Sequence, residues 1–265
     1  EGANAVEMYL EWMPNVVSDH HEMGGSIKGF YFSPGDADRT HHLIPQANQD
    51  LTYEITRHTA AALDQIGSLY FSKEGYDDFY LGKGAAYGDV QGSVGILYEQ
   101  VASRGYSRPL AVGTLDFPFT VRNQSFAAIS TVCSSYAIKE KLLDYQRNFY
   151  KNSAKEAAKD PVKGYVFNAR GNRAVEWHFL KHMEHHQVDV YKLANNTSQG
   201  GKNYSSTDSY IIPLEQKFYT KAKAVMENIT EFKDSTFYDI STWTLPHAYN
   251  LQYSEVSSVA GLLGE

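Results

Sequence analysis

Three short segments in the first half of the chain carry side chains that could together hydrolyse a peptide bond. The first is Asp19-His20-His21-Glu22, which follows a short apolar run. A neutral imidazole binds Zn²⁺, and a neighbouring carboxylate can orient its ring. His21 is therefore a candidate metal ligand. Adjacent histidines in a turn are, however, also common as solvated or core residues, so this segment alone leaves both interpretations open.

The second segment ends in Glu99, a carboxylate near the end of the apolar run at 93–100. Burial raises the pKa of a carboxyl group and suits it to take a proton from a metal-bound water. The competing interpretation is a carboxylate at a sheet edge, paired with Arg104. Either reading fits the residues.

The third segment, 78–84, places Tyr80 close to Gly82 and Gly84. A tyrosine in such a loop can close over a site and donate its hydroxyl to a substrate. It can equally be a packed side chain.

The order His21, Tyr80, Glu99 resembles the zinc carboxypeptidases of the carboxypeptidase A family. In that family a histidine at a strand end is followed by a mobile tyrosine and then by a catalytic glutamate. Asp-His-His-Glu-Met-Gly at 19–24 is similar to the Asp-Leu-His-Glu-Met-Gly signature of a bacterial branch. Leu97-Tyr98-Glu99-Gln100 with Arg104-Gly105 resembles that branch's segment around its general base. The resemblance extends from residue 1 to about residue 150.

The resemblance implies a role for each matched residue. His21 would be a zinc ligand, Glu99 the general base and Tyr80 a substrate-binding residue. Zinc would be the cofactor, and peptides that lose their C-terminal residue would be the substrates. The family also implies an extracytoplasmic location, either periplasmic or secreted.

One part of the family pattern is missing. The family's first two zinc ligands come from an upstream His-x-x-Glu motif, and none of the ten histidines of this chain is followed by a glutamate at that spacing. One imidazole cannot hold catalytic zinc tightly. We therefore expect the chain to be the C-terminal part of such an enzyme, binding zinc weakly and inactive alone. The alternative, from another class, is a non-catalytic peptide- or glycan-binding module that retains the peptidase fold.

Composition excludes several other classes of protein. The formal net charge of −7 disfavours a nucleic-acid partner, which would favour a basic surface. No apolar run is long enough to span a membrane. The single cysteine, Cys133, excludes an internal disulfide. The oligomeric state is not indicated.

Periodicity and breaker residues predict an α/β protein. Helices are expected at 3–12, 48–69, 125–158, 173–186 and 216–229. Strands are expected at 16–18, 29–33, 93–100, 162–167, 188–191 and 210–212. A long loop rich in Gly, Tyr and Asp is expected at 76–91, and a Gly/Ser/Asn loop at 195–208.

We expect two domains. Residues 1–159 would be a truncated carboxypeptidase domain with a mixed sheet. Residues 160–265 would be a small parallel α/β domain, because strands alternate with helices there. This second part resembles an amidotransferase-like, flavodoxin-like domain.

The second part is expected to be catalytically silent. Cys133 lies upstream in a predicted helix, so no nucleophilic cysteine is available to it. Ser241 is expected to be a helix N-cap. The histidines at 178, 182, 185 and 186 share a helical face, which suits either metal chelation or simple solvation.

Overall fold

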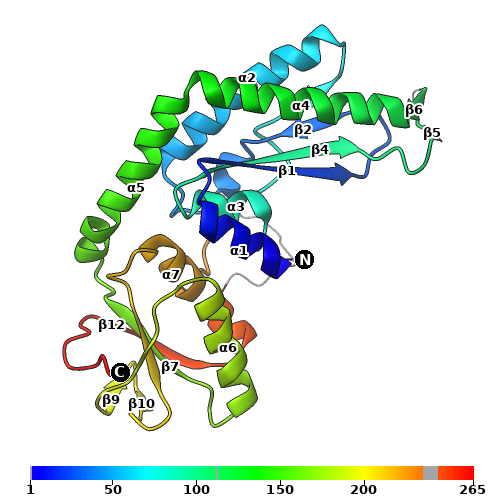
Figure 1. The fold of residues 1–265 in the computed structure, drawn as a ribbon. Coiled ribbons are helices and arrows are strands. Elements are labelled where there is room, and N and C mark those ends of the chain that lie inside the picture. The colour runs from blue at the N-terminus through cyan, green and yellow to red at the C-terminus, as the bar shows by residue number, and fades with distance from the viewer. Residues whose placement is uncertain (1, 112, 235–243) are drawn as a thin grey trace. The chain divides into compact units, whose positions relative to one another are not determined.

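The structure, a computed structural model, describes residues 2–111, 113–234 and 244–265. These residues form a mixed α/β protein with several sheets, as the sequence predicts (Figure 1). Contacts within the chain divide it into two compact units. The larger unit comprises residues 14–147 and 231–239, and the smaller unit comprises residues 1–13, 148–230 and 240–265.

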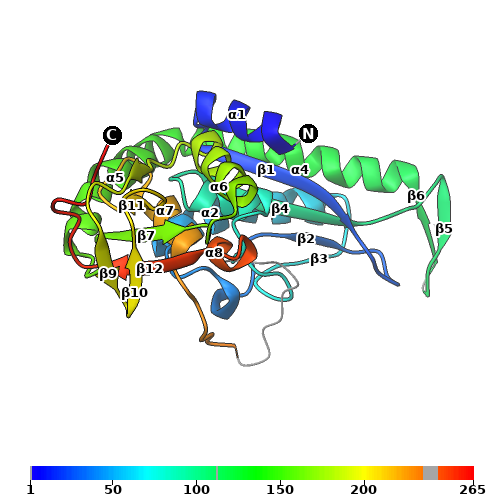
Figure 2. The same cartoon turned by 90° about the horizontal axis from the view of Figure 1, so that it is seen from below.

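The larger unit is built on a four-stranded mixed sheet, which confirms the expected sheet type. Its strands are β1 (Val16–Met23), β2 (Phe30–Phe32), β3 (Tyr70–Phe71) and β4 (Val94–Val101). The strand order is β1-β4-β2-β3 (Figure 2). β4 runs parallel to β1 and antiparallel to β2. Strands β5 (Ser107–Pro109) and β6 (Thr114–Asp116) form a separate antiparallel pair. β4 therefore lies inside its sheet, with a neighbour on each side.

Helices cover both faces of this sheet. They are η1 (Ala37–Arg39), α2 (Gln46–Gln65), α3 (Gly84–Asp89), α4 (Phe117–Ala137) and the first part of α5 (Lys139–Lys159). α2 and α4 lie on one face and the short α3 on the other (Figure 1). Ile55 of α2 packs with Ile96 and Tyr98 of β4 in a core that excludes water completely at these positions. Burying each large side chain contributes roughly 1.5–3 kcal/mol.

β4 is buried on both faces because its two sides meet different partners. On the α2 and α4 side, the Tyr98 hydroxyl lies 2.6 Å from Thr131 Oγ1 and 3.2 Å from Thr59 Oγ1. On the α3 side, a Cβ added to Gly95 would lie 2.1 Å from the backbone oxygen of Ala85. Only glycine permits this approach. The missing side chain at Gly95 thus sets how closely α3 lies on the sheet.

The single helix expected at 125–158 is wrong: α4 ends at Ala137 and α5 begins at Lys139. No glycine or proline lies at the break. Instead, Thr131 Oγ1 donates to the Ala127 carbonyl at 2.8 Å, and Ser134 Oγ donates to the Ser130 carbonyl at 2.7 Å. Side-chain bonds of this kind compete with the helical ladder and bend helices.

The smaller unit holds a second four-stranded sheet. Its strands are β7 (Gly164–Asn168), β8 (Tyr191–Lys192), β11 (Tyr210–Pro213) and β12 (Gln252–Val256), in the order β12-β7-β11-β8. Its other elements are α1 (Gly2–Trp12), α6 (Arg173–His185), α7 (Tyr219–Met226), α8 (Leu245–Ala248) and the hairpin of β9 (Thr197–Gln199) and β10 (Lys202–Tyr204). Every pairing in the four-stranded sheet is antiparallel. The parallel sheet expected in this region is therefore wrong.

The segment at 195–208, which was expected to be a loop, forms a β-hairpin before β11. Gly200 and Gly201 both have positive φ, at 56° and 73°, between the paired ends of β9 and β10. Two such residues form the tight turn of a β-hairpin. The chain leaves this hairpin and enters β11 between β7 and β8, antiparallel to both. The expected loop is thus a β-hairpin that precedes an antiparallel strand.

The bounds of the two units differ from the expected division at residue 160. The change between units falls inside α5, between Arg147 and Asn148, and α1 belongs to the smaller unit. Leu142 of α5 packs in the core of the larger unit, whereas the Tyr150 ring contacts Phe218 in the smaller one. A helix that serves two cores leaves no break in sequence to mark the boundary. Ser241 lies outside the described residues.

A buried ion pair fixes the start of β7 in the smaller unit. The Asp160 side chain is 3% exposed and pairs with Lys223 of α7. It also accepts hydrogen bonds from the Tyr219 hydroxyl at 2.7 Å and from the Val162 amide at 3.0 Å. Burial alone would raise the pKa of Asp160, but Lys223, Tyr219 and Val162 together lower it.

Asp160→Asn is expected to destabilise the smaller unit by about 1–3 kcal/mol at neutral pH, the range for hydrogen bonds to a charged group. Because the folded-state pKa is lowered, the stabilisation by Asp160 is present above the ordinary carboxyl range and is lost as pH falls through the folded-state pKa. The loss of stability in acid should therefore be smaller in the variant. Hydrogen exchange of the β7 amides against pH measures this, with the exposed Asp189→Asn as control. Equal acid sensitivity in Asp160→Asn and the original protein would contradict it.

Candidate functional site

The two residues singled out as ligand and base lie side by side in the larger unit. β1 and β4 pair in parallel with His21 opposite Glu99, close to the C-terminal end of each strand. Neighbouring strands lie about 4.8 Å apart. Both side chains line one cavity of about 370 Å³ on the α3 side of the sheet. The strand pairing thus brings these two distant residues into one site.

The His21 ring is oriented by a carboxylate on its own strand. Its Nε2 lies 2.8 Å from Asp19 Oδ1, and its side chain is 57% exposed. Residues two apart on a strand share a face, which is why Asp19 reaches His21 and not His20. An imidazole held in this way by a carboxylate presents its other nitrogen to a ligand, as in many metal sites. For His21 that nitrogen is Nδ1.

His20 points to the opposite face of the sheet. Its ring stacks on Tyr98 at 4.8 Å, and its Nδ1 lies 2.7 Å from Gln124 Oε1. Of the two adjacent histidines, one is therefore a packed residue and the other faces the cavity. The packed interpretation thus applies to His20, and the role of His21 as a metal ligand stays a prediction.

The Glu99 carboxyl group is half buried and incompletely paired. Its Oε2 is buried with no hydrogen-bond partner among the described residues. Burial raises the pKa of Glu99, Asp19 adds to the rise, and His21 opposes it. The alternative of an edge carboxylate paired with Arg104 is wrong, because β4 lies between β1 and β2. Glu99 is an oxygen acceptor held without a partner at the cavity wall.

The tyrosine that lines the cavity is Tyr76, not Tyr80. The Tyr76 ring stacks on Tyr31 at 4.0 Å, and its hydroxyl donates to Met23 Sδ at 3.2 Å. Burial, followed by the charge of Glu99, raises the pKa of Tyr76 to about 12. Tyr80 lies outside the described lining of the cavity, with its ring against Gly82. Its expected role in substrate binding stays a prediction.

Other cavity residues were not foreseen from the sequence. Asp77, Asp78 and Lys83 come from the aperiodic loop before α3, and Lys83 Nζ pairs with Asp77 Oδ1. Lys83 places a cation at a cavity whose other charged groups are mostly carboxylates. The only sequence signal was composition: a long segment rich in Gly, Tyr and Asp is typical of a functional loop.

The residues around His21 do not form a complete zinc site by themselves. Within the part of the chain that the structure describes, His21 belongs to no group of three donor side chains close enough to share an ion. Catalytic zinc takes three protein ligands and a water or substrate. The cavity offers one imidazole, that of His21, and one candidate base, Glu99. A catalytic zinc ion would need further ligands beside His21.

The histidines of α6 are only partly solvated. His178 is exposed, whereas the His182 Nδ1 lies 2.9 Å from the Tyr249 hydroxyl and its ring lies 4.7 Å from that of His186. Burial lowers the pKa of His186 to about 3, with contributions from His182, Lys221 and His185. The His182 and His186 rings are therefore packed within the smaller unit, whereas His178 is solvated.

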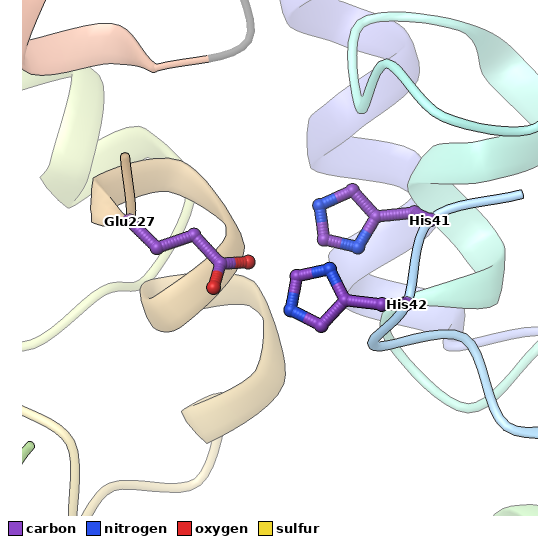
Figure 3. Close-up of side chains that lie close together, drawn as sticks. All are labelled: His41, His42 and Glu227. Carbon is purple, nitrogen blue, oxygen red and sulfur yellow. The ribbon is translucent and has the colours of Figure 1, made fainter. Parts of the chain in front are cut away.

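Two further histidines, His41 and His42, lie in the larger unit with their rings stacked 4.8 Å apart (Figure 3). His41 Nδ1 accepts a hydrogen bond from the Leu43 amide at 3.2 Å. Burial and the neighbouring His42 lower the pKa of His41 to about 3, so this ring is neutral. Glu227, also labelled there, caps α7 in the smaller unit. The two histidines and Glu227 belong to different units, so we assign no site to the three.

Comparison with protein-family models, with curated proteins and with solved structures returned no match. No helix among residues 2–111, 113–234 and 244–265 is long and apolar enough to cross a membrane.

Proposed function

We propose that this chain contributes a metal ligand, His21, and the general base, Glu99, to a zinc-dependent carboxypeptidase. The observation that carries the proposal is the pairing of His21 with Glu99 across adjacent parallel strands, with both side chains on one cavity. A ligand and a base that act on one water must lie this close. The family resemblance of the segments around both residues points to the same pair.

The chemistry proposed for the chain's own residues follows from their surroundings. Glu99, with its raised pKa and unpaired Oε2, takes a proton from water and later passes it to the leaving amine. Asp19 holds the His21 ring in place. Lys83, the cation of the described cavity lining, would contact the free carboxylate at the C-terminus of a peptide by exchanging its pairing with Asp77. A bound zinc ion would lower the pKa of the attacking water and polarise the scissile carbonyl.

The proposal requires two further zinc ligands, because among the described lining residues His21 is the one that the family resemblance matches to a ligand. The family's His-x-x-Glu motif is the natural source. An extracytoplasmic location is proposed on the same resemblance. The alternative class, a binding module without catalysis, would keep the cavity and lack those ligands.

Removing the proposed ligand should weaken zinc binding in a longer protein that supplies the missing motif. His21→Gln is expected to lower zinc affinity by more than the roughly 10- to 100-fold that loss of a ligand's hydrogen-bonding neighbour costs. The matched control is His20→Gln, which changes the adjacent ring on the opposite face and should leave affinity unchanged. Competition against a chromogenic chelator measures both. Equal zinc affinity in the two variants would remove His21 from the metal site.

A further inference from the structure

Two aspartates of the larger unit meet directly behind the cavity wall. Asp78 lies in the loop that precedes α3 and lines the cavity, and Asp89 is the last residue of α3. The two carboxyl groups lie within hydrogen-bonding reach of each other. Asp89 is completely buried. Asp78 is partly exposed as a residue, but its Oδ1 is sealed from solvent.

Uncharged donors satisfy one oxygen of each carboxyl group. Asp89 Oδ1 accepts from Asn48 Nδ2 at 2.7 Å and from the Gly95 amide at 2.6 Å. Asp78 Oδ2 accepts from Gln49 Nε2 at 3.0 Å. The other two oxygens, Asp78 Oδ1 and Asp89 Oδ2, are buried and have no other donor among the described residues. Two carboxylates offer only acceptors, so a hydrogen bond between them needs a proton.

We infer that Asp78 and Asp89 share one proton, and that this proton fastens the cavity-wall loop to the sheet. Asp89 is tied to β4 through Gly95 and to α2 through Asn48. Asp78 carries the loop that places Tyr76, Asp77 and Lys83 on the cavity. The pair thus acts on the cavity as a positioning device, and it does so whether or not the proposed peptidase function holds.

Burial is the main reason why the pair retains its proton. Burial raises the pKa of Asp78 to about 6, with Asp77 adding to the rise and Lys83 opposing it. Burial and the charge of Asp78 raise the pKa of Asp89 well above its ordinary range. The donors from α2, Asn48 and Gln49, carry no charge. On the β2 side the Tyr31 hydroxyl stays neutral, because burial raises its pKa.

The sign of the pH effect follows from these raised values. A carboxyl group whose folded-state pKa lies above its unfolded value contributes most to stability at low pH. That contribution falls as pH rises from the ordinary carboxyl range through the folded-state pKa. Loss of the shared proton leaves two buried like charges, which should loosen the loop and free Tyr76, Asp77 and Lys83.

The first test is infrared spectroscopy of the protein in D₂O, where a protonated carboxyl group absorbs apart from carboxylates. A carboxylic acid band should persist at about pH 7, above the ordinary carboxyl range, and should disappear in both Asp78→Asn and Asp89→Asn. The exposed Asp38→Asn is the control and should keep the band. Absence of the band from the original protein would overturn the inference. The presence or absence of the band in the original protein is decided without any variant.

The second test uses the same variants in urea unfolding. An asparagine at either position donates from its amide and replaces the shared proton permanently. The fall in unfolding midpoint between about pH 5 and about pH 8 should shrink by at least half in either variant, and not in Asp38→Asn. An unchanged fall would contradict the proposal. So would a midpoint that drops on chelation and recovers with Ca²⁺ or Mg²⁺, because a cation would then bridge the pair.

Discussion

Replacing Glu99 by glutamine is expected to lower kcat for release of a C-terminal residue by about 10²- to 10⁴-fold, the usual contribution of a general base. Glutamine keeps the shape of the side chain but cannot accept the proton of the attacking water. Glu99 is not the proposed ligand, so bound zinc should stay at the level of the original protein. Steady-state kinetics with a short peptide, together with metal analysis, measures both quantities in a longer protein that supplies the missing ligands.

The control for this experiment is Glu22→Gln. Glu22 is an exposed carboxylate next to His21 in sequence, on the opposite face of β1. The Glu22→Gln variant should leave kcat unchanged. A Glu99→Gln protein with undiminished turnover would take Glu99 out of the mechanism, and one that had lost its zinc would show that Glu99 acts on the metal site instead.

Gly95→Ala should have the largest effect on the fold around the cavity. The added Cβ would meet the Ala85 backbone at 2.1 Å, so α3 must move away from β4. That movement also strains the bond from the Gly95 amide to Asp89. Overpacking of this kind costs about 1–3 kcal/mol, occasionally more. Because Ala85 and Ala86 of α3 line the cavity, activity should fall together with stability.

Gly24→Ala is the matched control, since nothing lies within 4 Å of a Cβ added there. Urea unfolding and hydrogen exchange of the α3 amides separate the two variants. Rapid exchange in α3 for Gly95→Ala alone is the expected result. Equal midpoints and equal exchange in both variants would mean that the close approach of α3 is not needed.

The main cavity pair could be predicted from sequence because both residues lie in regular strands. An apolar run that ends in polar residues indicates a strand end. His21 follows one such run, and Glu99 lies near the end of another. The tyrosine of the cavity lining was not foreseen: Tyr76 lines the cavity, whereas the role of Tyr80 in substrate binding stays a prediction. The loop has no periodicity, and its path depends on contacts such as Asp78 with Asp89 that no local pattern contains.

The errors in the second sheet and the long helix have similar causes. Alternation of strands and helices predicted parallel pairing, but β11 enters between β7 and β8 after a hairpin that composition alone presents as a loop. The helix break at Ile138 depends on hydroxyl groups that bond to the backbone, for which helical periodicity gives no signal.

The most direct test of the central claim is a release assay on a longer protein that carries these residues with a His-x-x-Glu motif. The account predicts that the C-terminal residue of a short peptide is released, that a chelator stops the release, and that added zinc restores it. Release that continues unchanged in the presence of the chelator would contradict the account. Binding of the peptide with no shortening, at saturating zinc, would instead identify a binding module with the His21–Glu99 cavity as its site.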